Sequence, residues 1–356
     1  MYSPKFTITN DILLNIGLIE AAREVIKNAP LIPVYEARFV KDAIVRTVHH
    51  GTHLEGNDLT LAETKRIIEG ENILSGHRDV QEVINYRKVL EYLDELEKEA
   101  KEGFYYNSQI LKKINEIVCE RIPLEGETKP GEFRSVQVVL KDERTGEVVF
   151  RPPPAIEVPF LVESFLDWLN SPEGKKIHPV LRAGIAHYFL VACHPFVEGN
   201  GRTARAFATL ILFLEGYDIK KFFSLEEYFD KDAHRYYQAL TLADQSGPLE
   251  ERDLTPWLEY FTQAMAVELT RIKEQVKRLS LDVKVKSKVG YQIPLNSRQV
   301  RLMEYLEEKG SITTQEARRL IPEYSEDTLL RDLNYFVSQG IAKKQGKTKG
   351  ARYMLK

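Results

Sequence analysis

Residues 194–205 bring together side chains that bind phosphate and side chains that move protons. They read His-Pro-Phe-Val-Glu-Gly-Asn-Gly-Arg-Thr-Ala-Arg, which combines an imidazole, a carboxylate, two glycines and two arginines in twelve positions. An imidazole can accept a proton from an attacking hydroxyl near neutral pH. Forked guanidinium groups bind phosphate oxygens through paired hydrogen bonds. The stretch therefore predicts the transfer of a phosphate-containing group to a hydroxyl.

Two predicted helices position this stretch. Apolar residues recur at helical spacing from about Ile177 to Cys193, and Pro195 prevents that helix from continuing. A second helical pattern covers Arg202 to Gly216, so Gly199-Asn200-Gly201 is expected to be the turn that opens the second helix. Unpaired amide groups and the positive end of the helix dipole make such an opening an anion site. We expect a polyphosphate there, with His194 across the turn from the arginines.

The stretch resembles the signature of the Fic family, His-Pro-Phe-x-Asp/Glu-Gly-Asn-Gly-Arg-x-x-Arg, at every fixed position. This resemblance implies the transfer of AMP from ATP to a Ser, Thr or Tyr hydroxyl of a target protein, with pyrophosphate leaving. It further implies that His194 deprotonates the hydroxyl and that Glu198 holds Mg²⁺, while the phosphates are bound by Gly199, Asn200, Gly201, Arg202 and Arg205. The family's phosphorylating branch replaces the glycine before the first arginine with Lys and loses the acidic position. Because this chain keeps both residues, nucleotidyl transfer is favoured over phosphoryl transfer.

A second segment bears on whether the site is active. Residues 52–57 read Thr-His-Leu-Glu-Gly-Asn and follow a helical pattern. They resemble the inhibitory helix of the family, Ser/Thr-x-x-x-Glu-Gly/Asn, which implies that Glu55 pairs with Arg205 and blocks the position of the γ-phosphate. The chain departs from this pattern because Gly51 stands four residues before the glutamate, and the hydroxyl residue is Thr52. In the family this glutamate can also position water that removes AMP, so de-AMPylation remains an alternative.

A β-hairpin is predicted between residues 133 and 151. Alternating apolar and polar residues precede a turn at residues 142–146, and Val148 and Phe150 form the return strand. The Fic family has a flap at this place, which aligns an extended segment of the target protein as an added strand. An exposed strand edge can do this generically. A structural hairpin without a partner is the alternative.

Two further groups of residues are candidate binding residues. Tyr236 and Tyr237, with Tyr228 and Arg235, fall where Fic proteins tend to place part of the adenine pocket. Their rings could stack on the base, although aromatic residues at helical spacing are usually core. His49 and His53 lie four residues apart on one helix face, but no third metal ligand is in place beside them.

The rest of the chain predicts a mainly α protein: a Fic helical bundle with a β-hairpin flap and a small C-terminal winged helix-turn-helix domain. We expect an N-terminal helical region at 1–105 that carries the inhibitory helix, a catalytic core at 106–279, a basic linker at 280–294 and the winged helix at 295–356. Helical periodicity is clearest at Ile12–Ile26, Ala37–His50, Val80–Ala100, Ile110–Arg121, Val158–Asn170 and Trp257–Leu279.

The sequence pattern of the C-terminal 62 residues predicts the element order of a winged helix. Helices are expected at Arg298–Lys309, Thr314–Leu320 and Glu326–Gln339, followed by strands at 341–345 and 351–355. This segment holds 12 Lys and Arg against 8 Asp and Glu, and the sequence leaves open whether it binds DNA or protein. A DNA-binding regulator that senses nucleotide without transferring it is therefore a rival to the transferase.

Composition sets the remaining expectations. The chain has 356 residues and a net charge of −3, which gives no global signal for nucleic acid or membrane binding. Its first thirty residues lack the pattern of a secretion signal, and two cysteines do not make a disulfide framework. We expect a cytoplasmic protein, where ATP is present, and the sequence leaves a homodimer open.

Overall fold

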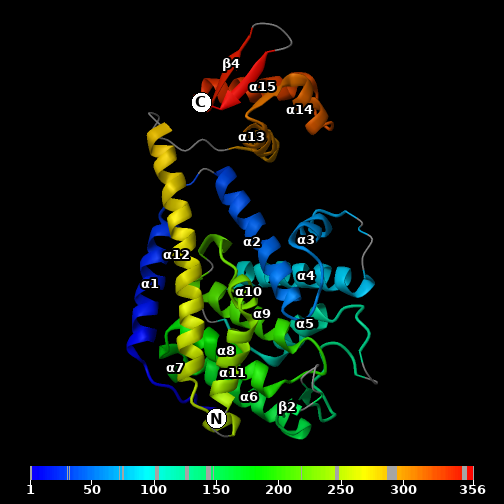
Figure 1. Cartoon of the computed structure of the whole chain (residues 1–356), viewed down its shortest axis with the longest axis vertical. Coiled ribbons are helices and arrows are strands. Elements are labelled where there is room, and N and C mark those ends of the chain that lie inside the picture. Colours follow the sequence, from blue (N-terminus) through cyan, green and yellow to red (C-terminus); the bar gives the residue numbers. More distant parts are fainter. Residues whose placement is uncertain are drawn as a thin grey trace. The chain divides into compact units, whose positions relative to one another are not determined.

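The chain forms two compact units, Met1–Lys27 with Lys41–Lys273 and Asn28–Val40 with Glu274–Lys356. Figure 1 shows that helices dominate both units, as predicted. The structure is a computed structural model, and it describes all residues except 1, 30, 32, 72, 74–75, 101–103, 125–127, 142–145, 147, 218, 245–247, 287–294, 347–350 and 356. Among the described residues, no helix is long and apolar enough to cross a membrane.

The larger unit is organised around two helices, α8 (Pro179–Cys193) and α9 (Asn200–Leu212), which pack against each other. Nearly every residue of α8 is buried, since its sequence is apolar on all sides, and such a helix belongs in a core. Helices α4 (His77–Glu99) and α5 (Ser108–Val118) also pack against α9. The start of α9 is therefore surrounded by elements that can hold side chains against it.

The remaining helices of this unit cover the central pair. Helix α1 lies beside the first half of α12 in both figures, and the Asn15 side chain donates to Thr262 Oγ1 across this contact, at 3.2 Å. The bounds are α1 (Asn10–Lys27), α2 (Pro33–His53), α3 (Leu61–Ile68), α6 (Val158–Asn170), α7 (Pro172–Lys176), α10 (Leu225–Lys231), α11 (Ala233–Asp244) and α12 (Thr255–Lys286), of which α2 begins and α12 ends in the smaller unit.

The predicted hairpin is present but shorter than expected. Strand β1 (Leu140–Lys141) pairs antiparallel with β2 (Val148–Phe150), and Leu140 is opposite Phe150. The alternating residues 136–139 do not form a strand in the structure, although their pattern predicted one. Their side chains are mostly exposed, so they lack the packing partner that normally stabilises a strand. Most of the predicted turn lies outside the described residues.

The C-terminal part of the smaller unit has the predicted order of three helices and two strands. Helices α13 (Ser297–Lys309), α14 (Thr314–Leu320) and α15 (Glu326–Ser338) pack on a three-stranded antiparallel sheet of order β3-β5-β4. The strands are β3 (Ser311–Thr313), β4 (Ala342–Gln345) and β5 (Arg352–Leu355). The sequence analysis missed β3, because three residues are too few to show an alternating pattern. The winged helix assignment stays a prediction.

The predicted linker does not begin where the sequence analysis placed it. Helix α12 continues through Ser280 to Lys286, whereas we expected the linker to begin at residue 280. No glycine or proline occurs between these positions, so nothing in the backbone chemistry ends the helix there. Residues 287–294, the second half of the predicted linker, lie outside the described residues.

Candidate active site

The loop between α8 and α9 has the conformation that the motif predicts. Helix α8 ends at His194, whose backbone is left-handed with φ 50° and ψ 61°. Gly199 caps α9 with φ 75°, so the helix begins at Asn200, two residues earlier than predicted. A Cβ on Gly199 would lie 2.7 Å from Val118 Cγ1, which excludes other residues from this position on packing as well as on conformation. The fold thus requires a glycine immediately before the open start of α9.

His194 is held as a neutral base. Its Nδ1 lies 3.3 Å from the carbonyl oxygen of Val191, a partner that assigns the proton to Nδ1 and leaves the lone pair on Nε2. Burial, with a smaller contribution from the nearby Arg134 charge, lowers the pKa of His194 to about 4 against the opposing effects of Val191 and Glu55. At neutral pH the imidazole is therefore able to accept a proton.

The two motif arginines carry buried donors that lack protein partners. Arg202 is 1% exposed and Arg205 is 3% exposed. Arg202 forms ion pairs with Glu198 at 3.2 Å and with Glu82 at 3.3 Å. Within the described residues, however, its Nε and the Nε of Arg205 have no hydrogen-bond partner, and its Nη1 has only the Glu82 ion pair. Unsatisfied buried donors cost free energy, so these atoms fit a site completed by phosphate oxygens.

The predicted pair between Glu55 and Arg205 is present. Arg205 Nη2 donates to Glu55 Oε1 at 2.9 Å and to the carbonyl oxygen of Gly51 at 2.8 Å. Burial would raise the pKa of Glu55, but the Arg205 and Arg202 charges leave it lowered, so the carboxylate is ionised. Glu55 lies in the turn after α2, and its Oε1 is 2.3 Å from where a Cβ on Gly201 would stand. The carboxylate therefore lies directly over the start of α9.

The departure from the inhibitory pattern has a packing reason. A Cβ on Gly51 would lie 2.4 Å from Cε1 of Tyr86, so the tyrosine ring occupies the space that a larger residue would need. The Tyr86 hydroxyl donates to the buried carboxylate of Glu226 at 3.0 Å. The Thr52 hydroxyl instead donates to the carbonyl oxygens of Val48 and His49 within its own helix. Thr52 thus does not reach the site.

We expect the substitution Gly51→Ala to destabilise the protein by about 1–3 kcal/mol, because the added methyl overpacks the contact with Tyr86. Helix propensity alone would predict the opposite sign. Gly17→Ala in α1 is the matched control, since nothing lies within 4 Å of the new methyl, and it should stabilise by roughly 0.4–1 kcal/mol. Denaturant unfolding of both variants measures the difference, and an equal effect of the two would contradict the packing explanation.

Glu198 is placed to act as a metal ligand. Its side chain is 35% exposed, and Oε1 is 3.2 Å from Arg202 Nη2 and 3.5 Å from Arg78 Nη2. A carboxylate oxygen suits Mg²⁺, which usually binds through one or two carboxylates together with substrate phosphates. The described residues contain no group of three or more His, Cys, Asp or Glu side chains that could hold a metal by themselves. Glu198 thus fits a metal that arrives with a nucleotide.

The three histidines at the end of α2 contact side chains of two neighbouring helices. His50 Nδ1 and His53 Nδ1 lie 2.7 Å and 2.8 Å from the two carboxylate oxygens of Asp230 on α10. His49 Nδ1 is 3.5 Å from Thr64 Oγ1. These contacts join the last turn of α2 to α10 and α3, so the three rings secure the segment that carries Glu55.

The two predicted adenine-pocket residues differ in accessibility. Tyr236 is 1% exposed, stacks on Phe229 with ring centroids 4.9 Å apart, and has its hydroxyl 3.2 Å from His187 Nε2. Tyr237 is 48% exposed and donates to the carbonyl oxygen of Leu54 at 3.1 Å, next to Glu55. Only the ring of Tyr237 is open to a ligand in this arrangement. The adenine pocket stays a prediction.

Spacing in the sequence did not reveal several residues that shape the site. Asn115 on α5 donates to the carbonyl oxygen of Glu198 at 2.9 Å and to Thr203 Oγ1 at 3.2 Å, and it accepts from the Gly131 amide at 3.0 Å. Glu82 on α4 pairs with Arg202. Both belong to ordinary helical patterns, and their partners are distant in sequence.

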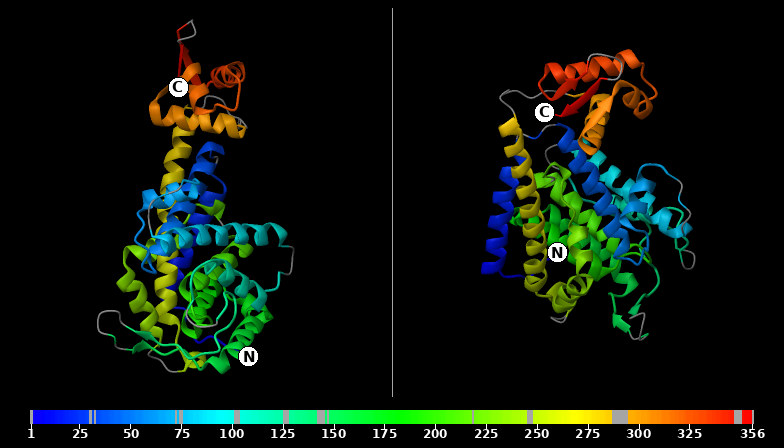
Figure 2. Two further views of the ribbon diagram at one scale, coloured as in Figure 1. Left: turned by 90° about the vertical axis from the view of Figure 1, so that its right-hand side faces the viewer. Right: turned by 45° about the horizontal axis from the view of Figure 1, so that its top comes forward.

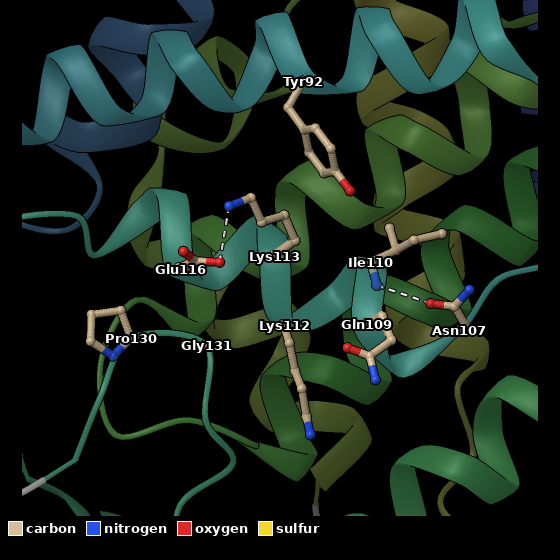
Figure 3. A pocket seen from close by; sticks show the side chains of 9 residues that line it. All are labelled: Tyr92, Asn107, Gln109, Ile110, Lys112, Lys113, Glu116, Pro130 and Gly131. Carbon is tan, nitrogen blue, oxygen red and sulfur yellow. Dashed lines mark hydrogen bonds and ion pairs between the residues drawn. The ribbon is translucent and has the colours of Figure 1, made fainter.

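A pocket of about 480 Å³ lies beside α5, at residues that the motif does not include (Figure 3). Some of its polar groups have partners: Lys113 pairs with Glu116 at 3.0 Å, and Asn107 caps α5 through the Ile110 amide at 3.0 Å. The Lys112 ammonium lies 4.5 Å from the centroid of the Phe133 ring. The pocket therefore offers no group suited to the predicted chemistry.

We expect the free energy of unfolding to decrease as the pH falls below 6.5. His187 is 0% exposed, and burial lowers its pKa well below the ordinary value of 6.5, with the Arg205 charge acting in the same direction. The unfolded chain then binds a proton that the folded chain does not, which removes up to about 1.4 kcal/mol per pH unit for this group.

Denaturant unfolding at pH 7 and pH 5.5 measures this dependence. The matched variant is His187→Phe, which keeps a ring against Trp257, whose centroid lies 4.8 Å from that of His187. This variant should show a shallower pH dependence than the native chain. Equal slopes for both proteins would show that His187 does not carry the effect.

Comparisons with known proteins relate the chain to the Fic/DOC family. The Fic/DOC family matches residues 105–212. Protein adenylyltransferase Fic of Drosophila willistoni is 30% identical over 249 residues, which cover 66% of this chain and 43% of that protein. The protein of the same name from Nematostella vectensis is 29% identical over 256 residues, covering 68% of this chain and 52% of that protein. The chain thus spans about half the length of these relatives.

The fold agrees as well. A crystal structure of a Fic family protein from Desulfovibrio desulfuricans has a TM-score of 0.65 and 23% identity, and the match covers 100% of this chain and 98% of that chain. A Fic domain containing signaling protein from Bacteroides thetaiotaomicron has a TM-score of 0.63, also at 23% identity, over 76% of this chain and 97% of that chain. The chain is a Fic/DOC family protein, related to protein adenylyltransferase Fic.

Proposed function

We propose that the chain is a protein adenylyltransferase that transfers AMP from ATP to a Ser, Thr or Tyr hydroxyl of a target protein, and that Glu55 inhibits it. One observation carries this proposal: a neutral imidazole and buried, unpartnered guanidinium donors occur in one loop and helix start. Nucleotide binding alone would need the donors but not the base. The relatives named protein adenylyltransferase support the same chemistry.

The proposed reaction follows from the positions of the protein groups. The α- and β-phosphates would lie on the amides that open α9, and Arg202 and Arg205 would bind the distal oxygens. The target hydroxyl attacks the α-phosphorus while His194 Nε2 takes its proton. The bond from the α-phosphorus to the bridging oxygen breaks, and pyrophosphate leaves with the electron pair. Mg²⁺ held by Glu198 would neutralise charge on the phosphates.

The flap would align the target protein. Four apolar side chains of the flap are exposed: Val136 is 52%, Val139 is 39%, Leu140 is 37% and Val148 is 38% exposed. Since Val136 and Val139 lie outside the strand pairs of the structure, an extended target segment could pair with this part of the backbone. Such pairing would use main-chain hydrogen bonds.

Inhibition follows from the position of the Glu55 carboxylate. It lies over the start of α9 and occupies Arg205 Nη2, a donor that would otherwise bind the γ-phosphate. A carboxylate at this place both cancels the guanidinium charge and fills the space for the ligand. The native chain should therefore bind ATP weakly or in an unreactive orientation.

Labelled ATP with Mg²⁺ and cell lysate tests the proposal. The native chain, Glu55→Gly and the double variant Glu55→Gly with His194→Ala should differ, with label entering protein only for Glu55→Gly. Intact-mass measurement then identifies the addition of AMP. Removal of AMP from modified protein, with no addition by any variant, would instead indicate the reverse reaction. Nucleotide binding without transfer or removal by any variant would favour a nucleotide-sensing regulator.

A further inference from the structure

We propose that Arg134 is a positioning residue that locks the flap to the catalytic loop and fixes the backbone of His194 through one buried guanidinium. The inference rests on the proposed function and extends it. It names the residue that fixes the position of the flap relative to His194. Arg134 is 2% exposed and is one of the largest fully buried side chains in the described part of the protein.

The acceptors of Arg134 are backbone carbonyl oxygens from both elements. On the catalytic loop, Nε donates to His194 at 2.7 Å and Nη2 to Cys193 at 3.4 Å. On the flap, Nη1 donates to Val136 at 3.3 Å and Nη2 to Pro153 at 2.5 Å. A single planar group thus ties both arms of the flap to the end of α8.

The backbone of the same residue adds a further link. The Arg134 amide donates to the carbonyl oxygen of Pro195 at 2.9 Å. Three consecutive carbonyl groups of the catalytic loop therefore have Arg134 as a donor. Among the contacts that the described residues form, the guanidinium has no carboxylate partner, so its charge is solvated by peptide dipoles alone.

The conformation of His194 needs such a support. Its φ of 50° places a non-glycine residue in the left-handed region, which persists only when the surroundings hold it there. The strong hydrogen bond from Arg134 Nε fixes the direction of the His194 carbonyl and hence the peptide plane from which the ring projects. Arginine suits this role because its fork donates in several directions at once, whereas the lysine ammonium is a point charge.

The functional consequence concerns the target hydroxyl. A target segment that pairs with the flap must bring its hydroxyl to Nε2 of His194, so an error in the position of the flap becomes an error at the reacting atoms. Misplacement by about 1 Å can reduce a reaction rate roughly 100-fold. Arg134 limits this error because the flap and the backbone of His194 both bind the same guanidinium group. The Arg134 charge also contributes, after burial, to the lowered pKa of His194.

The test compares Arg134→Lys and Arg134→Met, each in the Glu55→Gly background. The matched control is Arg182→Lys, since Arg182 is 1% exposed and bonds to Glu215 at 2.7 Å and to the Leu169 carbonyl oxygen at 3.4 Å, away from the flap. Lysine keeps the charge and loses the fork, while methionine loses both. Circular dichroism and thermal melting establish the folded fraction of each variant.

The first readout is the titration of the His194 imidazole by NMR of nitrogen-labelled histidine, assigned with His194→Gln. Arg134→Met should raise the midpoint by roughly one pH unit, because the repulsive charge is gone, and Arg134→Lys should leave it nearly unchanged. The second readout is AMP incorporation into lysate protein from labelled ATP. Both Arg134 variants should reduce kcat roughly 100-fold at an unchanged KM for ATP, and Arg182→Lys should change neither.

The two readouts separate the inference from the proposed function. If Glu55→Gly transfers no AMP, the proposed function fails, and the titration midpoint still decides the role of Arg134. The inference would be overturned if both Arg134 variants kept the native titration midpoint of His194. It would also be overturned if their kcat per folded molecule equalled that of Arg182→Lys. If Arg134→Met does not fold, Arg134→Lys decides through the split between kcat and KM.

Discussion

Replacing Glu55 with glycine should raise the rate of AMP transfer by roughly 10- to 100-fold, the range of typical coupling between a regulatory contact and a ligand. The carboxylate occupies Arg205 Nη2 at 2.9 Å and stands over the first turn of α9. Its removal frees the donor, restores the guanidinium charge and opens the space above Gly201. All three changes favour a bound triphosphate in the orientation that reaction requires.

Arg205 should remain in place after this substitution. Nη2 still donates to the Gly51 carbonyl oxygen at 2.8 Å, and the side chain is buried close to Tyr86 and Tyr236. The arginine therefore loses its competitor and keeps its support. For this reason we expect a gain in activity and not a collapse of the site.

Isothermal titration of ATP and labelled transfer to lysate protein measure the gain. Glu71→Gly is the matched control, because Glu71 makes the same kind of ion pair, with Arg66 at 2.7 Å, but both side chains are 52% exposed and outside the site. The control should change neither quantity. Equal rates for Glu55→Gly and the native chain would show that the contact with Arg205 does not inhibit.

The catalytic loop could be predicted from sequence because its geometry is local. A proline after His194, a glycine that needs a positive φ and an apolar run on each side determine where one helix ends and the next begins. The start of α9 was placed at Arg202 and lies at Asn200, since Gly199 itself is the cap. Its end was predicted at Gly216 and lies at Leu212, after which a π-helical turn covers Phe213–Tyr217.

The contact between Glu55 and Arg205 joins positions 150 residues apart, so no local pattern predicts it. Only the resemblance to the inhibitory helix indicated the pair. The glycine at position 51 looked like a defect in that pattern. In the structure it leaves room for the ring of Tyr86, which no spacing in the sequence associates with residue 51.

Arg134 illustrates what sequence reasoning misses. It is a single basic residue at the start of a predicted hairpin, and solvent exposure is the usual expectation for arginine. Its burial depends on carbonyl groups that the α8 terminus and the flap bring together in three dimensions. Helices α3, α10 and α11 were not predicted either.

Replacing His194 with alanine in the Glu55→Gly background should lower the rate of AMP transfer by roughly 100- to 10,000-fold, the usual contribution of a general base. The imidazole is held neutral, with a pKa lowered to about 4 mainly by burial, and Nδ1 is committed to the Val191 carbonyl oxygen. In the proposed reaction, Nε2 is therefore the atom that would take the proton. Affinity for ATP should change little, because the phosphate donors belong to α9.

The same pKa predicts how the rate depends on pH. With the base already deprotonated above about pH 5, the Glu55→Gly variant should transfer AMP at a rate that does not vary between pH 6 and 8 and falls as the pH approaches 4. Glu55 raises the pKa of His194, so its removal can only move this fall to lower pH. A rate that instead rises through pH 6.5 would show that His194 titrates like an exposed histidine.

His234→Ala is the control for this substitution, since His234 is exposed on α11 and outside the motif. It should keep both the transfer rate and the flat pH profile of Glu55→Gly. If His194→Ala lowered ATP affinity and transfer by the same factor, the histidine would shape the binding site without moving a proton. Loss of transfer at unchanged ATP affinity separates a base from a binding group, and that separation decides between transferase and nucleotide sensor.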